Sequence, residues 1–331
     1  MTPMRVKKEY FVLAVLILGL SLYIMLRNPN KIHFQLPELS KVSTEEITKI
    51  EISTKERSIL LGKNDNSWYI LPQKYLVSKY QISKILETIE GLTLTALVSE
   101  SKNYKRYALD DDNKTSVKAW AGDNLKREFE VGKITGENYS HTFVKLGGDY
   151  RVYHAQGNLK SRLSQTVGTL RDKTVLSFDK SEIRELSISK DEHTLVLSRN
   201  QIDMGGDSDQ GTKGNTEVAT VSQTIWQSAG GKKADNPTVN GLLAKLSTLR
   251  CSEYIDGRKK EDFTDPIYTV QLKGAKGYTL SVFERVDENA NTYPAISSQN
   301  DYPFNLPIWL AEEIMKSPEE ILGVATGSKE K

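Results

Sequence analysis

Four histidines are the first residues in this sequence that could do chemistry: His33, His141, His154 and His193. None of them stands three or four residues from another histidine or from a cysteine, the spacing that brings two metal ligands onto one helix face. His141 and His154 fall on neighbouring predicted strands and could approach each other. Two half-exposed strand histidines explain them more simply than a metal site does, so we predict no metal ligands.

Two acidic segments offer clustered oxygens of the kind that calcium prefers, 110–113 (Asp-Asp-Asp-Asn) and 207–209 (Asp-Ser-Asp). Neither follows the spacing of an EF-hand loop, and the turn preference of Asp and Asn explains both. Phosphate-binding patterns of the types G-x-x-x-x-G-K-[ST] and G-x-G-x-x-G do not occur. The nearest segment, 229–233 (AGGKK), is interpreted as a turn before a helix. We therefore predict no cofactor.

Nucleophile signatures are equally scarce. The chain has no G-x-S-x-G elbow, and its single cysteine, Cys251, lacks a catalytic signature and is expected to be a buried thiol. Trp68 and Trp226 could stack on a ligand. A role in the core is favoured, because they hold equivalent places in the two copies of an internal repeat that is described below. No catalytic residue is predicted and the chain is not expected to be an enzyme. A hydrolase of envelope polymers, the less favoured alternative, would need two converging carboxylates.

Composition narrows the function classes further. The 331 residues are 38% hydrophobic and 27% charged, which fits ordinary folded cores, and the length favours two domains. A formal net charge of +2 is too small for the electrostatic footprint of a nucleic-acid binder. The single cysteine excludes an internal disulfide framework.

An uncharged apolar run occupies 10–26 (YFVLAVLILGLSLYIML), with Arg5, Lys7 and Lys8 before it. Its length, about 17 residues, is at the short end for a bilayer-spanning helix. A cleaved signal peptide is the alternative, but no small-x-small cleavage site follows the run. We predict an uncleaved transmembrane helix in the inner (cytoplasmic) membrane. The basic residues place the amino terminus in the cytoplasm and the remaining chain in the periplasm or extracytoplasmic space.

A short sequence with a strand pattern occurs twice in the chain, as EEITKIEIS at 45–53 and as SEIRELSIS at 181–189. Each copy continues with a hairpin partner, a tryptophan and a helix with one apolar stripe, and further alternating strands follow. The stripe residues are Ile82, Ile85, Leu86, Ile89 and Leu92 in the first copy and Val239, Leu242, Leu243, Leu246 and Leu249 in the second. Asp235 stands where a helix-capping residue is expected. We interpret the pattern as an internal duplication.

The predicted fold class is α+β: an N-terminal transmembrane helix followed by two tandem similar domains, each a mainly antiparallel sheet with one long amphipathic helix. We predict five segments: a cytoplasmic terminus with the anchor at 1–27, a tether at 28–44, two α+β repeats at 45–176 and 177–322, and a disordered tail at 323–331. The second repeat carries a flexible Gly- and Ser-rich insertion at 201–222.

These features resemble the bacterial family catalogued as domain of unknown function 4340. The matching features are the anchor, the TKIEI-type strand, the tryptophan-containing strand, the turn at 107–110 (YALD) and the junction at 171–179 (RDKTVLSFD). The second copy departs from the turn pattern, with FTDP at 263–266. The resemblance implies an envelope protein, often associated with genes for gliding-motility-type ABC transport systems, and it transfers no catalytic residue.

We therefore expect a noncatalytic, membrane-anchored accessory or binding subunit of an ABC-type transport or surface-assembly system. Anchoring would raise the effective concentration of the domains near a membrane partner. Expected partners are the membrane and an ABC permease or other envelope proteins, with no nucleic acid and with no small-molecule ligand identified. A structural or scaffolding envelope protein is the alternative.

Overall fold

The computed structural model describes residues 8–26, 35–191, 193–204 and 221–324. The chain divides into two compact units. Unit 1 comprises Met1–Gln73 and Tyr80–Gln165, and unit 2 comprises Lys74–Lys79 and Thr166–Lys331. Each unit is described by itself below.

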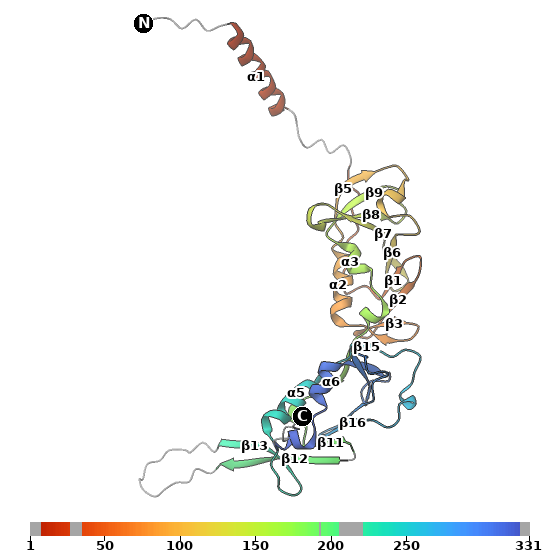
Figure 1. Ribbon diagram of the computed structural model, residues 1–331. Coiled ribbons are helices and arrows are strands. Elements are labelled where there is room, and N and C mark those ends of the chain that lie inside the picture. Colours follow the sequence, from red (N-terminus) through yellow and green to blue (C-terminus); the bar gives the residue numbers. More distant parts are fainter. Residues whose placement is uncertain (1–7, 27–34, 192, 205–220, 325–331) are drawn as a thin grey trace, which may run out of the picture. The chain divides into compact units, whose positions relative to one another are not determined.

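Unit 1 is built on antiparallel strands (Figure 1). Its helices and strands are α1 (Lys8–Leu26), β1 (Lys49–Ser53), β2 (Ser58–Asn64), β3 (Ser67–Leu71), α2 (Lys79–Glu90), β5 (Leu94–Ser99), β6 (Thr115–Ala121), β7 (Asn124–Thr135), β8 (His141–Leu146), β9 (Val152–Gln156) and α3 (Leu159–Leu163). Within unit 1 the strand order is β3-β2-β1-β6-β7-β8-β9-β5, and the short strand β4 (Tyr75–Leu76) belongs to the segment Lys74–Lys79 of unit 2.

Alternation of apolar residues explains why these strands form. In β1 the side chains of Ile50 and Ile52 are buried, while their neighbours are partly exposed. In α2 the stripe residues Ile85 and Ile89 are almost fully buried. Burying one such side chain stabilises the fold by about 1.5–3 kcal/mol. The helical and the two-residue periods therefore each place apolar side chains on the buried side of their element.

Unit 2 has the same kinds of elements. They are α4 (Val167–Leu170), β10 (Thr174–Ser177), β11 (Glu185–Lys190), β12 (His193–Met204), β13 (Val221–Ser228), α5 (Asn236–Leu246), β14 (Thr248–Arg250), β15 (Glu253–Tyr254), β16 (Tyr268–Lys273), β17 (Gly277–Val282), β18 (Thr292–Ser297), β19 (Phe304–Pro307), α6 (Ile308–Ile314) and α7 (Pro318–Ile321). Helix α5 begins at the predicted cap, where the Asp235 side chain accepts a hydrogen bond from the Thr238 N–H. The predicted stripe packs into the core, with Val239 and Leu246 fully buried.

The two large sheets share one topology. Unit 2 has the strand order β13-β12-β11-β16-β17-β18-β19-β15. Replacing each strand by its counterpart in sequence order gives β3-β2-β1-β6-β7-β8-β9-β5, the order in unit 1. β10 and β14 form a separate two-stranded sheet. Shared strand order is the arrangement that an internal duplication produces.

The predicted fold class needs correction. The described chain is a mostly antiparallel sheet protein, with sheets of nine and eight strands and seven α-helices within the described ranges. Apart from α1, only α2 and α5 exceed ten residues, so helices contribute less than an α+β description implies. The strands dominate because each copy has alternating segments on both sides of its single long helix.

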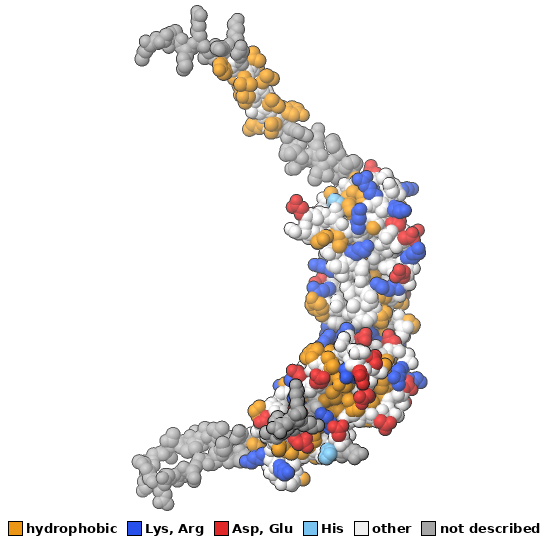
Figure 2. All heavy atoms as spheres, in the orientation of Figure 1, with side chains coloured by type: hydrophobic (Ala, Val, Ile, Leu, Met, Phe, Trp, Pro, Cys, Tyr) orange, Lys and Arg blue, Asp and Glu red, His pale blue; other side chains and the backbone are white. Residues whose placement is uncertain are grey.

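The predicted transmembrane helix is also overturned. Among the described residues, no helix is both long enough and apolar enough to cross a bilayer. Large apolar side chains along α1 are exposed in this structure (Figure 2).

Several predicted segments lie wholly or partly outside the described residues. These are the cytoplasmic terminus at 1–7, most of the tether's first half at 27–34, most of the insertion at 205–220 and the tail at 325–331. At its ends, the predicted insertion 201–222 is strand instead, because β12 continues to Met204 and β13 starts at Val221. The domain bounds 45–176 and 177–322 stay predictions.

Candidate binding pocket in unit 2

The pocket is built around Arg171, which follows the short helix α4. Thr166 and Thr169 form a capping box that starts this helix, and its last residue, Leu170, is buried. The Asp172 N–H donates to the Leu76 carbonyl and the Ser78 N–H donates to the Leu170 carbonyl, both over 2.8 Å. These backbone bonds hold the segment Lys74–Lys79 of unit 2 against the Arg171 backbone.

Three tyrosines surround the Arg171 side chain. Its guanidinium carbon lies 3.7 Å from the ring centroid of Tyr75, 3.6 Å from that of Tyr254 and 4.9 Å from that of Tyr302. Two rings this close to one carbon would overlap on a single face, so Tyr75 and Tyr254 cover opposite faces of the guanidinium. The Tyr75 and Tyr302 rings meet edge to face, with centroids 5.1 Å apart. Such contacts stabilise a cation by about 0.5–2 kcal/mol each.

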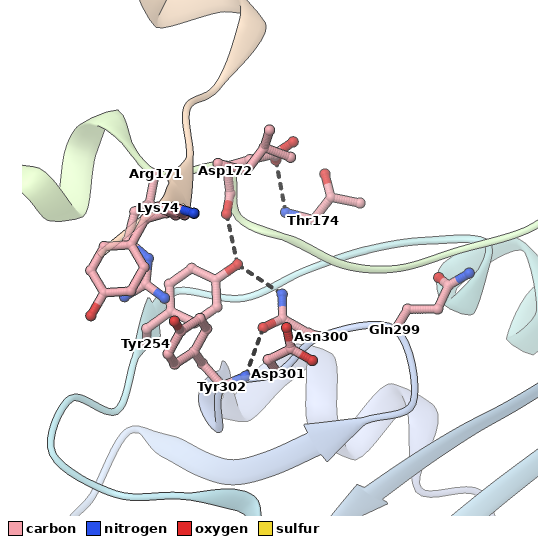
Figure 3. A pocket seen from close by; sticks show the side chains of 11 residues that line it. Lys74, Arg171, Asp172, Thr174, Tyr254, Gln299, Asn300, Asp301 and Tyr302 are labelled. Carbon is pink, nitrogen blue, oxygen red and sulfur yellow. Dashed lines mark hydrogen bonds between the residues drawn. The ribbon is translucent and has the colours of Figure 1, made fainter. Parts of the chain in front are cut away.

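Hydrogen bonds hold two of these tyrosines, Tyr254 and Tyr302, in place (Figure 3). The Tyr254 hydroxyl donates to the Asp172 carbonyl over 2.7 Å and accepts from Asn300 Nδ2 at 3.1 Å. Asn300 Oδ1 in turn accepts from the Tyr302 N–H at 3.0 Å. Burial raises the pKa of Tyr254 to about 12. The phenol therefore stays neutral and remains a donor to Asp172 at physiological pH.

The cavity beside Arg171 has a volume of about 220 Å³ and all of its lining residues belong to unit 2. This is below the range of about 300–1,000 Å³ typical of drug-sized ligands, so a small polar group fits best. Besides Arg171, the lining carries charged side chains on Lys74, Asp172 and Asp301. Lys74 and Asp301 make no side-chain hydrogen bond or ion pair with any residue that the structure describes. Both charges remain free to meet a ligand.

Arg171 keeps most of its hydrogen-bonding capacity. The residue is only 4% exposed, and among the described residues its one acceptor is Asp256, whose Oδ1 lies 3.2 Å from Nη1. A guanidinium carries five N–H donors in its plane. Stacking occupies the two faces and leaves that edge available. The arrangement can therefore bind a polar or anionic group without covalent chemistry.

The histidines considered for a metal site are not gathered around this pocket. His141 and His154 lie in unit 1, where their ring centroids are 5.7 Å apart and Phe143 packs on His154. Burial lowers the pKa of His154, and the nearby His141 adds to this effect. His193 is exposed, and His33 lies outside the described residues. Within the described ranges, no three His, Cys, Asp or Glu side chains cluster as metal ligands do.

The acidic turn at 110–113 has local partners. Asn113 Nδ2 donates to both carboxylate oxygens of Asp110. Lys114 pairs with Asp111 and Lys55 with Asp112, each over 2.7 Å. These contacts use the oxygens that a calcium ion would need. Of the second acidic segment, 207–209, nothing can be added because it lies outside the described residues.

Cys251 and the two repeat tryptophans are core residues by burial. Burial raises the pKa of the Cys251 thiol to about 11, so at neutral pH it is protonated and a poor nucleophile. Trp68 is 6% exposed and Trp226 is 1% exposed. They lie on the counterpart strands β3 and β13.

Sequence reasoning located one part of the pocket and missed the other. The junction 171–179 (RDKTVLSFD), noted above as a family signature, supplies Arg171, Asp172 and Thr174 to the lining. Tyr75, Tyr254 and Tyr302 were not predicted. They come from three distant places in the chain, and single tyrosines carry no spacing signal.

The fold and the pocket define a class: a duplicated, antiparallel sheet protein with a tyrosine-framed arginine in a small polar cavity. A protein-family model described as "Domain of unknown function (DUF4340)" matches residues 70–266. The match covers more than half of the chain, which therefore belongs to this family and confirms the resemblance. No curated protein matches significantly. No solved structure matches significantly either.

Proposed function

We propose that this protein is a noncatalytic binding protein and that the Arg171 pocket is its ligand site. The observation that carries the proposal is a buried guanidinium that uses only one of its donors and faces a cavity. The remaining side-chain N–H groups of Arg171 are not fully buried, so a ligand can reach them. Elsewhere in this unit the candidate nucleophile Cys251 is buried and protonated, which favours binding over chemistry.

At a finer level, we propose that the protein is an accessory or binding subunit associated with an ABC-type transport or surface-assembly system in the cell envelope. Both the association with a transport system and the location in the cell envelope rest on what the family resemblance implies. The free charges of Lys74 and Asp301 at the pocket rim support a polar partner.

Photocrosslinking tests the proposal. A benzophenone amino acid is placed at Asp301, which lines the pocket, in the full-length chain within native cells. The matched control carries it at Val286, which is 84% exposed and does not line the pocket. We expect the Asp301 probe, and not the Val286 probe, to capture a transport permease or another envelope component. Equal capture by both probes, or capture of the chain alone by the Asp301 probe, would contradict the accessory-subunit proposal.

The location is tested separately with a membrane-impermeant maleimide. Val286→Cys creates an exposed thiol in unit 2, and the unmodified chain is the control because Cys251 is only 5% exposed. If unit 2 lies outside the cytoplasm, Val286→Cys is labelled in intact cells. Labelling only after lysis contradicts that location.

A further inference from the structure

The faces of the Arg171 guanidinium are filled, so a ligand must approach it edge-on. Tyr75 and Tyr254 lie within 3.7 Å of the guanidinium carbon on its two faces. The remaining in-plane N–H groups form a planar fork. A carboxylate matches that fork with two parallel hydrogen bonds, and charge-assisted pairs of this kind are stronger than neutral ones.

Asp256 already places a carboxylate at this edge, but loosely. Its side chain is 77% exposed and contacts Arg171 through a single oxygen at 3.2 Å. An ion pair with a solvent-exposed partner contributes little to stability. Gly257 follows with φ of +79°, in the left-handed region that favours glycine. An incoming carboxylate can therefore displace Asp256 at small cost.

The other charges in the pocket favour a single negative charge on the ligand. Lys74 adds a second cation, whereas Asp172 and Asp301 line the same cavity of about 220 Å³. A phosphate dianion would meet repulsion from both aspartates, whereas a monoanionic carboxylate gains from Arg171 and Lys74. Asp301 can accept hydrogen bonds from amide N–H groups on the rest of the ligand, whereas Asp172 Oδ1 already accepts from the Thr174 N–H and lies 3.9 Å from Arg250 Nη1.

We infer that the Arg171 pocket binds the carboxylate of a small acid or of a peptide end, and that Asp256 is an internal competitor for this site. The inference rests on the proposed binding function and names the chemical class of its ligand. The ligand carboxylate takes the Nη1–Nη2 edge of Arg171 bidentately, including the Nη1 donor that Asp256 now uses, and so releases Asp256 to solvent.

Calorimetric titration of the full-length chain tests the inference. The probes are N-acetylglycine, its dipeptide homologue N-acetylglycylglycine, the neutral N-acetylglycinamide and inorganic phosphate. We expect both carboxylates to bind and the amide not to bind, with phosphate at least ~10-fold weaker because of the two aspartates. Tighter binding of the dipeptide would identify a peptide end as the source of the carboxylate, and tighter binding of N-acetylglycine a free small acid. Equal binding of amide and acid, or stronger binding of phosphate, would overturn the inference.

Three variants test whether Asp256 competes with the ligand for Arg171. Asp256→Asn is expected to tighten N-acetylglycine binding about 5-fold, the scale of a weak surface ion pair. Glu261→Gln removes the same charge from an exposed position outside the pocket and should leave affinity unchanged. Lys74→Gln, also at an exposed position, should weaken binding about 3-fold. If Asp256→Asn weakens binding or leaves it unchanged, Asp256 is not a competitor and the inference fails.

The two proposals fail in different ways. If crosslinking at Asp301 is not selective but N-acetylglycine still binds, the accessory-subunit proposal is wrong and the carboxylate site is retained. If crosslinking is selective but no carboxylate binds, the carboxylate site is wrong and the accessory-subunit proposal is retained.

Discussion

The Arg127 guanidinium on β7 donates a 2.6 Å hydrogen bond to the carbonyl of Ile89, at the carboxyl end of α2. Arg127 is 7% exposed and also reaches the Glu90 carbonyl at 3.4 Å. The last carbonyls of a helix have no partner within it, and a cation there also meets the negative end of the helix dipole. Arg127, a residue of strand β7, thus caps the carboxyl end of α2.

We expect Arg127→Gln to lower the free energy of unfolding by about 2–3 kcal/mol, because it removes a charged, buried donor to helix carbonyls. Urea unfolding monitored by circular dichroism measures the change. Arg162→Gln, at an exposed position in α3 without a described side-chain partner, is the control and should change little. Equal losses in the two variants would show that capping by Arg127 is unimportant.

Asp149 should make unit 1 sensitive to acid. Hydrogen bonds from Arg151, and a further one from the Tyr153 hydroxyl, lower the pKa of Asp149 from 3.8 to about 2. A lowered pKa in the folded state contributes stability above the unfolded value, and this contribution is lost as the pH falls from about 4 through 2.

Asp149→Asn is therefore expected to cost about 1–2 kcal/mol at pH 7, given about 1.4 kcal/mol per pKa unit and some solvent screening. Its unfolding free energy should also vary less than that of the wild type between pH 4 and pH 2. Asp123→Asn, in an exposed turn, is the control. A wild-type pH profile that matches the Asp149→Asn profile would refute this assignment.

The two tryptophans of unit 2 should respond very differently to truncation. Trp226 is 1% exposed in the core, whereas Trp309 on α6 is 62% exposed. We expect Trp226→Ala to cost about 3–5 kcal/mol through lost burial and a cavity. Trp309→Ala should change stability by less than about 0.5 kcal/mol. Chemical denaturation of both variants measures this, and a small loss for Trp226→Ala would argue against its core role.

Two glycines give opposite expectations for the same substitution. A Cβ on Gly132 would stand 2.2 Å from the Tyr107 carbonyl oxygen, so Gly132→Ala must shift the backbone. We expect a loss of about 2 kcal/mol or more from such overpacking. On Gly241, inside α5, a Cβ meets nothing within 4 Å. Gly241→Ala should stabilise by about 0.5–1 kcal/mol through helix propensity. Thermal unfolding distinguishes the signs, and a stabilised Gly132→Ala would contradict the close approach.

Local pattern was a reliable guide to the elements of this fold. The strand at Lys49–Ser53 and the cap at Asp235 are present, and the predicted stripes lie on α2 and α5 except for Leu92 and Leu249, which follow the ends of these helices. Such features depend on residues close in sequence, whose periodicity shows which side is buried. The predicted transmembrane helix was wrong, since no helix among the described residues is both long and apolar enough to cross a bilayer.

Short-range sequence patterns predicted the family, the repeated order of strands and helix, and the antiparallel character of the sheets. The binding pocket, in contrast, depends on the three-dimensional fold. Tyr75, Tyr254 and Tyr302 converge on Arg171 from β4, β15 and the segment before β19. A cation–π contact requires ring and guanidinium within about 6 Å, and residues this far apart in sequence reach that distance only through the fold.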